Sequence, residues 1–191
     1  MKNRNFTGDE FEAKWQDLLA EIVNGYPNIS AGSLIDLEMP LGANRMYLET
    51  LMVSRLAAEL LPNSSECQVF LGHAYNNIGD LVLAAQCYEK AYDLAMRKIQ
   101  EKQLTKNDAI YLDASDYLRH LANTENSLLR HVDAFLHAVK ALSMVREAKA
   151  KFKYPPIYKV LHRICEGMHL INLAEEYRLL SVEPEREVVG E

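Results

Sequence analysis

Residues 68–91 of the chain read QVFLGHAYNNIGDLVLAAQCYEKA, and this stretch decides the fold. Apolar residues recur at helical spacing on both sides of the dipeptide Gly79-Asp80. Glycine tolerates the left-handed backbone conformation that a tight corner between two helices needs. The stretch therefore predicts two amphipathic helices joined by a short turn.

Small residues in this stretch indicate how the two helices pack. Gly72 and Ala84 are small enough to let the helices approach closely, and we expect these two residues to lie next to each other. The larger side chains of Leu71, Tyr75 and Tyr88 would fill the remaining space.

The spacing Gln68-x-x-Leu71-Gly72-x-x-Tyr75, then Gly79-Asp80, then Ala84-x-x-x-Tyr88-x-x-Ala91 resembles the tetratricopeptide repeat. The resemblance covers about residues 65–98 and implies an all-α fold, a right-handed array of α-hairpins. Two positions depart from the family pattern. Gln68 replaces the usual tryptophan, and Met96 stands where a proline normally closes the repeat, so the second helix can run past its usual end.

The rest of the chain also has helical periodicity, which gives about seven helices in all. Residues 1–42 are expected to hold one helix, capped by Thr7, and an irregular loop. Residues 43–182 are expected to form the helical domain, and residues 183–191 a flexible tail. The other predicted helices cover residues 44–61, 63–78, 81–102, 105–127, 128–154 and 157–180. Gly167 is a possible break in the last one, which we expect to cap the array.

Degenerate copies of the repeat are expected on both sides. Shifted toward the N-terminus, the pattern places Ala91 on Ala57. Toward the C-terminus two registers compete. One places Tyr88 on Phe135, and we call it the Phe135 register; the other pairs Gly72 with Ala122 and Ala84 with Ala134, and we call it the Ala134 register. The sequence leaves this choice open.

The resemblance also implies where a ligand would bind, because the first helix of each pair lines the concave face in this family. We carry the family's ligand-facing positions onto the first repeat of this chain and extend them to the next repeat by the Phe135 register. The candidate peptide-binding residues are then Glu66, Val69, His73, Asn76, Asn77, Asp113, Asp116, His120 and Asn123. Acids, histidines and amides along one face could hold an extended peptide by hydrogen bonds to its backbone. Val69 and His73 stand where carboxylate-gripping members of the family have lysine and asparagine, so a C-terminal carboxylate clamp is not expected.

Composition narrows the classes of partner. The formal net charge of −6 argues against a nucleic-acid binder, which needs a basic surface. No stretch approaches the roughly 20 apolar residues of a membrane span, and no signal peptide is apparent. The three cysteines, Cys67, Cys87 and Cys165, are too scattered for a disulfide framework, which favours a reducing cytoplasm.

One pattern invites an enzymatic interpretation. His162, Cys165 and His169 share one helical face, and Glu166-x-x-His169 has the spacing of a helical di-iron ligand pair. A di-iron site needs a second Glu-x-x-His motif, which this sequence does not contain. We therefore expect no metal, no cofactor and no catalysis.

The leading hypothesis is a cytoplasmic adaptor or chaperone that binds a peptide or a helix of another protein. The main alternative is a self-associating scaffold, a homodimer in which the long helices after residue 128 pack across a two-fold axis.

Overall fold

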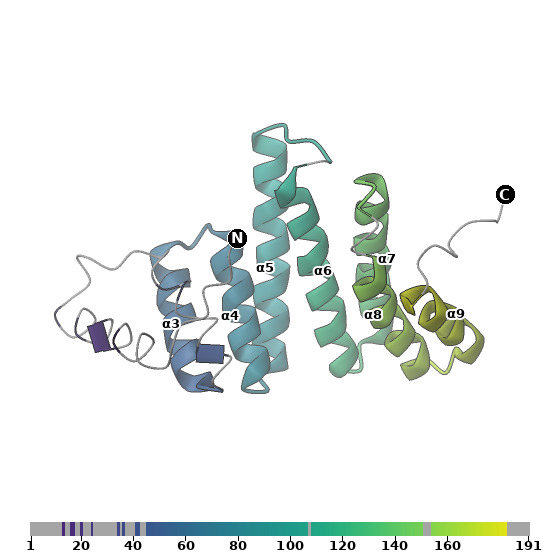
Figure 1. Ribbon diagram of the computed structural model, residues 1–191, viewed down its shortest axis with the longest axis horizontal. Coiled ribbons are helices and arrows are strands. Elements are labelled where there is room, and N and C mark those ends of the chain that lie inside the picture. The colour runs from purple at the N-terminus through teal and green to yellow at the C-terminus, as the bar shows by residue number, and fades with distance from the viewer. Residues whose placement is uncertain are drawn as a thin grey trace.

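The computed structural model describes residues 45–106, 108–150 and 154–182, together with residues 13, 16, 17, 20, 24, 34, 36, 41 and 42. This part of the chain contains helices and no strand. The helices are α3 (Tyr47–Leu60), α4 (Ser65–Asn77), α5 (Leu81–Glu101), α6 (Ala109–Ser127), α7 (His131–Glu147), α8 (Tyr154–Gly167) and α9 (Ile171–Val182). They follow one another in chain order across the molecule (Figure 1).

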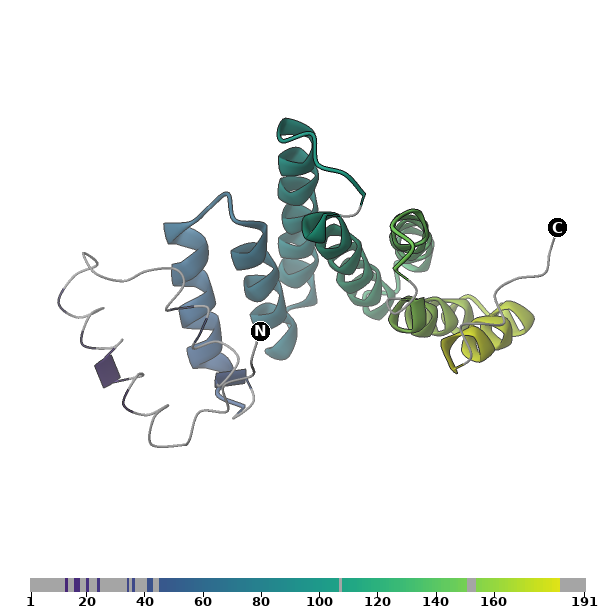
Figure 2. The ribbon, with the colours of Figure 1, turned by 45° about the horizontal axis from the view of Figure 1, so that its top comes forward.

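Each helix packs against the next one in the chain, and α6 also contacts α8. Figure 2 shows α3, α4 and α5 at one end of this array and the pair α8 and α9 at the other. The expected fold, an all-α array of consecutive hairpins, is confirmed. Within the described residues, none of these helices combines the length and the apolar character needed to cross a bilayer.

The ends of the helices follow from local hydrogen bonds. The Ser64 hydroxyl accepts a bond from the backbone N–H of Cys67 and so caps α4, and the Asp80 carboxylate caps α5 by accepting from Leu83. Pro155 and Pro156 lie in the first turn of α8, not before it. Proline is tolerated there because backbone N–H groups in the first turn of a helix make no hydrogen bond within the helix. Most of the predicted helix after Thr7 and all of the tail after residue 182 lie outside the described residues; residues 13, 16, 17 and 20 of that helix are described and are helical.

The turns between paired helices settle the repeat register. Gly79, Leu129 and His169 all have positive φ, at 86°, 61° and 58°. At each turn the next residue donates its backbone N–H to a carbonyl five positions earlier, for example Asp80 to Tyr75 and Arg130 to Glu125. Gly79 therefore corresponds to Leu129, and this is the same shift that pairs Ala84 with Ala134. The Ala134 register is correct and the Phe135 register is wrong.

The expected single helix over residues 157–180 is also wrong. Gly167 ends α8, His169 takes the left-handed conformation, and α9 begins at Ile171. The result is a third helix pair, and Ala174 is buried in it at the position equivalent to Ala84 and Ala134. Ile171 is exposed at the start of α9.

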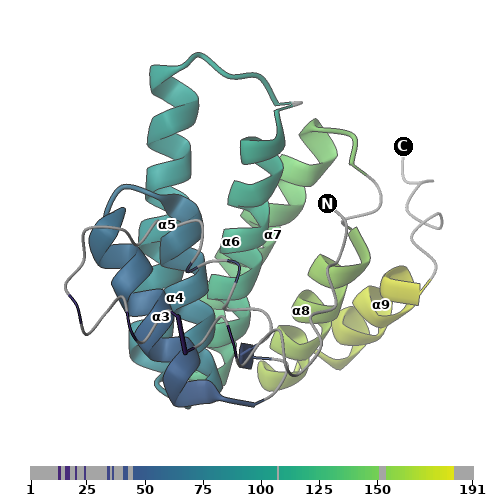
Figure 3. The same cartoon turned by 60° about the vertical axis from the view of Figure 1, so that its left-hand side comes forward.

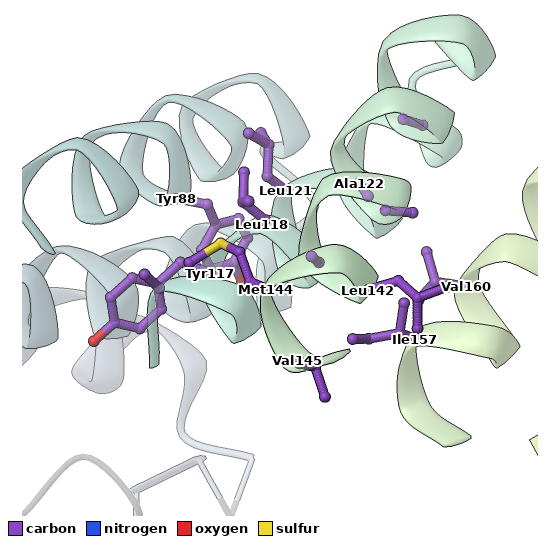
Figure 4. Close-up of a cluster of buried hydrophobic side chains, with 14 of the residues drawn as sticks. Tyr88, Tyr117, Leu118, Leu121, Ala122, Leu142, Met144, Val145, Ile157 and Val160 are labelled. Atoms are coloured by element: carbon purple, nitrogen blue, oxygen red, sulfur yellow. The ribbon is translucent and has the colours of Figure 1, made fainter. Parts of the chain in front are cut away.

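One buried cluster runs through α4 to α8. It joins side chains from successive hairpins, and the part drawn in Figure 4 includes Tyr88, Leu118, Leu121, Leu142, Ile157 and Val160. A second cluster joins α3 to α4 and to residues before α3, and it includes Leu34, Leu41, Val53 and Cys67. The array is therefore held by side chains shared between neighbouring helices, as expected for a repeat protein.

The nearest neighbour of Gly72 on α5 is Tyr88. A Cβ added at Gly72 would lie 2.7 Å from Cε1 of Tyr88, and the three nearest atoms all belong to that ring. The pair α4 and α5 is thus confirmed as a closely packed hairpin, but the ring of Tyr88 makes glycine necessary at position 72.

Candidate functional site

A groove of about 810 Å³ opens between the N-terminal halves of α4 and α6. Its sides come from the loop before α4, from the first turns of α4 and α6, and from the second half of α5. The lining residues are Leu61, Pro62, Asn63, Ser64, Ser65, Glu66, Val69, Phe70, Leu94, Lys98, Ala109, Ile110, Asp113 and Tyr117. We call this the α4–α6 groove.

The length of α5 contributes to this groove. At 21 residues α5 is longer than α4, and its second half extends past its neighbour (Figure 3). Leu94 and Lys98, which belong to this second half, line the groove. Met96 in place of the closing proline permits this extension, because proline would have ended the helix.

Carboxylates set the charge in the α4–α6 groove. Burial raises the pKa of the Tyr117 phenol, and a hydrogen bond with Ser65 opposes that shift. The negative charges of nearby carboxylates raise the pKa further; they belong to Asp113, Glu66 and Asp116. The potential at the Tyr117 side of the groove is therefore negative.

Beyond Phe70, aromatic and imidazole rings join α4 to α5 and α6. The rings of His73 and His120 have centroids 4.7 Å apart, and His120 stacks on Tyr88 at 5.4 Å. Phe70 lies 6.3 Å from His73 on the groove side. These four residues, which we call the ring cluster, bridge the hairpin α4–α5 to α6 at the inner end of the groove.

The electrostatics of the ring cluster favour neutral histidines. Burial lowers the pKa of His73, and the positive charge of Arg119 lowers it further. The Arg119 guanidinium lies 2.9 Å from Nε2 of His120. Because a guanidinium can only donate, Nε2 of His120 must be an acceptor, and the ring is then neutral. Nε2 of His73 is buried without a hydrogen-bond partner.

The structure divides the predicted site residues into three groups. Glu66, Val69 and Asp113 line the α4–α6 groove, although Val69 is only 8% exposed. His73 and His120 meet in the ring cluster. The remaining residues lie elsewhere on α4 and α6. Asn76 and Asn77 of α4 are exposed, and Asp116 and Asn123 of α6 are half-buried.

Sequence reasoning missed several residues of the groove. Leu61, Lys98 and Ile110 were not predicted, because they lie outside the positions that the repeat pattern assigns to the ligand. The correct register also changes one equivalence: Asn76 corresponds to Asn126, not to Asn123. Oδ1 of Asn126 lies 2.8 Å from Nδ1 of His131, so this amide holds the start of α7.

The proposed metal ligands on α8 are used otherwise. Nδ1 of His162 lies 2.9 Å from the carbonyl oxygen of Ala174, across the hairpin α8–α9. His169 lies in the turn after α8, and Cys165 is buried. Among the residues that the structure describes, no group of three or more histidine, cysteine or acidic side chains could hold a metal ion.

The consecutive hairpins form a fold of the tetratricopeptide type, and the groove lies on it between α4 and α6. No protein-family model matches the sequence, and no curated protein does.

Solved structures do match this fold. A crystal structure of MamA, a protein that contains tetratricopeptide repeats, superimposes with a TM-score of 0.66 at 20% sequence identity. The superposition covers 93% of this chain and 88% of MamA. A second crystal structure of MamA protein gives a TM-score of 0.65 at 19% identity, over 95% of this chain and 87% of that one. At this level of identity the likeness shows the fold.

Proposed function

We propose that this protein is an interaction module, an adaptor or chaperone without catalytic activity, that binds a peptide or a helix of another protein. The bound segment lies along the first helices of the first two pairs, α4 and α6. It enters the α4–α6 groove beside Glu66, Val69 and Asp113 and continues over the ring cluster toward Asn76 and Asn123. A cytoplasmic location is part of the same proposal, supported by the burial of the three cysteines.

The observation that carries this proposal is the α4–α6 groove itself. It is a concave surface of about 810 Å³ in which apolar side chains from three helices and the loop before α4 stand beside a few charged groups. Apolar walls with a small number of placed polar groups are typical of binding sites. A helical-repeat fold supports the same conclusion, since such arrays bind partners on extended surfaces.

The proposal can be tested by affinity capture with three forms of the immobilised full chain. The wild type is compared with the double variant Asn76→Ala/Asn123→Ala and with the outer-face variant Gln86→Ala/Lys90→Ala. Removing two hydrogen-bonding amides should weaken the capture of a specific partner by about 1–3 kcal/mol if each leaves a desolvated group unpaired. Equal capture by all three forms, at equal melting temperatures, would remove this part of α4 and α6 from the site.

A second candidate function, self-association, is favoured by one surface. The exposed face of α7 carries Val132, Leu136 and Val139 at helical spacing, next to Leu129 in the preceding turn. Leu129, Val132 and Leu136 are 77%, 63% and 61% exposed. Isologous packing of this face would make a homodimer. Light scattering of the wild type and of Leu136→Glu at micromolar concentration tests this: a monomeric wild type removes the candidate.

A further inference from the structure

The lining of the α4–α6 groove combines two kinds of surface. Leu61, Val69, Phe70 and Ile110 give it apolar walls, which favour a bulky apolar side chain. Glu66 and Asp113 stand within the same lining, one on each of the two helices that face each other across the groove. An apolar side chain and a cation could therefore be accommodated side by side.

The negative charge of the groove is concentrated at its Tyr117 side, and two contributions oppose it. The N-termini of α4 and α6 both border the groove, and each carries about half a positive charge. Lys98 is the only cationic side chain among the lining residues. The charges that act on Tyr117 are nevertheless the carboxylates of Asp113 and Glu66, with a smaller contribution from Asp116, which is paired with Arg119 at 3.3 Å. An acidic segment would be repelled from the Tyr117 side.

We infer that the α4–α6 groove binds a partner segment in which a lysine or arginine stands next to a bulky apolar residue. The apolar side chain lies against Phe70 and Ile110, and the cation lies between Glu66 and Asp113. This inference rests on the proposed function, and it narrows the class of partner from any peptide to a basic and apolar one.

The experiment is a selection of random dodecapeptides displayed on phage, with the immobilised full chain as the target. We expect selected sequences to be enriched in lysine or arginine adjacent to leucine, isoleucine, phenylalanine or tryptophan. A selected peptide, labelled with a fluorophore, is then titrated by anisotropy against the wild type and against Glu66→Gln/Asp113→Asn. The variant should bind about tenfold more weakly, which corresponds to about 1.4 kcal/mol.

The matched control is Glu89→Gln/Asp93→Asn, which removes two carboxylates from exposed positions of α5 that do not line the α4–α6 groove. It should bind the selected peptide like the wild type. Raising the salt concentration should weaken binding to the wild type and to this control, and it should have less effect on the groove variant.

The possible failures are distinguishable. Selected peptides without a basic preference, whose binding is reduced by Ile110→Ala but not by Glu66→Gln/Asp113→Asn, would overturn the inference and leave the proposed function standing. Selected peptides that bind equally to all of these variants would place the site elsewhere. Failure to select any sequence above background would count against both the inference and the proposed function.

Discussion

The ring of Tyr88 lies directly over the backbone of Gly72, so that a methyl group on Gly72 would stand 2.7 Å from Cε1 and 2.9 Å from Cδ1 of the ring. Tyr88 is only 2% exposed and is stacked on His120, so the ring has little freedom to move away. This relationship fixes the distance between α4 and α5 and places the ring cluster at the inner end of the groove.

Gly72→Ala should therefore destabilise the protein by about 1–3 kcal/mol, because the added methyl group overpacks the contact with Tyr88. Gly72→Leu should cost at least as much. Gly42→Ala is the control, since an added Cβ there meets nothing within 4 Å. Denaturant unfolding of both variants measures the difference, and an unchanged midpoint for Gly72→Ala would mean that the packing of α4 on α5 is different.

The turn residues give a prediction of the opposite sign. Leu129 has φ of 61° in the turn between α6 and α7, where a side chain costs roughly 1–2 kcal/mol. Leu129→Gly relieves this strain and should stabilise the protein by about 0.5–1 kcal/mol after the entropy of glycine is subtracted. The reverse change at the equivalent turn, Gly79→Ala, should destabilise by a similar amount. Melting temperatures that move in the same direction for both variants would contradict the Ala134 register, which makes these two turns equivalent.

The last helix pair should be indispensable. Ile157, Val160 and Leu161 of α8 are buried in the main cluster. Ile157 and Val160 lie close to Leu142 of α7 (Figure 4). Deleting residues 154–191 would expose that surface, and we expect aggregation or loss of cooperative unfolding. Deleting only residues 183–191 is the control and should leave the unfolding curve unchanged. A soluble and cooperatively folding chain that ends at residue 153 would disprove the capping role of α8 and α9.

Two histidines should give stability opposite dependences on pH. The pKa of His73 is lowered by burial and by Arg119, so the unfolded chain binds more protons at this residue than the folded chain does. The contribution of His73 to folding stability is therefore present above the unfolded pKa, near 6.5, and is lost as the pH falls below that value. The pKa of His137 is raised, chiefly by its hydrogen bond with Glu125 at 2.7 Å. Its contribution is complete below about 6.5 and is lost as the pH rises through the higher folded pKa.

These two contributions can be separated by substitution. His73→Phe keeps a ring in the ring cluster and should flatten the fall in stability on the acid side. His137→Gln should flatten the fall on the neutral side and lower stability, because it weakens the partner of the buried Glu125 carboxylate. Free energies of unfolding between pH 5 and pH 8 measure both effects. A His73→Phe profile that parallels the wild type would show that His73 does not contribute to the pH dependence.

The sequence predicted the hairpin at residues 65–101 well because each local signal agreed. Ser64 and Asp80 cap their helices, Gly79 makes the turn, and Gly72 permits close packing. It predicted the later turns poorly because Leu129 and His169 adopt positive φ without being glycine. No residue type marked the end of α6, so α7 was expected to begin too early. Gly167 marked only a possible break, so α8 and α9 were expected to be one helix.

The candidate site was only partly accessible to sequence reasoning. Of the positions predicted within the first repeat, Glu66 and Val69 line the groove, whereas Asn76 and Asn77 do not. Positions that depended on the Phe135 register were not repeat-equivalent. His73 and His120 nevertheless meet, because α4 and α6 approach each other beyond Phe70, a contact that no spacing along the chain specifies.

The central claim is that a partner segment occupies the α4–α6 groove, and site-specific photo-cross-linking tests it most directly. A benzophenone amino acid is placed singly at Glu66 or Ile110 in the groove and at Gln86 or Asp133 on the outer faces of α5 and α7. The proteins are irradiated in native lysate, and cross-linked peptides are identified by mass spectrometry. The account predicts cross-links from Glu66 and Ile110 to one segment of one partner, and none to that segment from Gln86 or Asp133. Cross-links to a partner from the outer positions alone would contradict it.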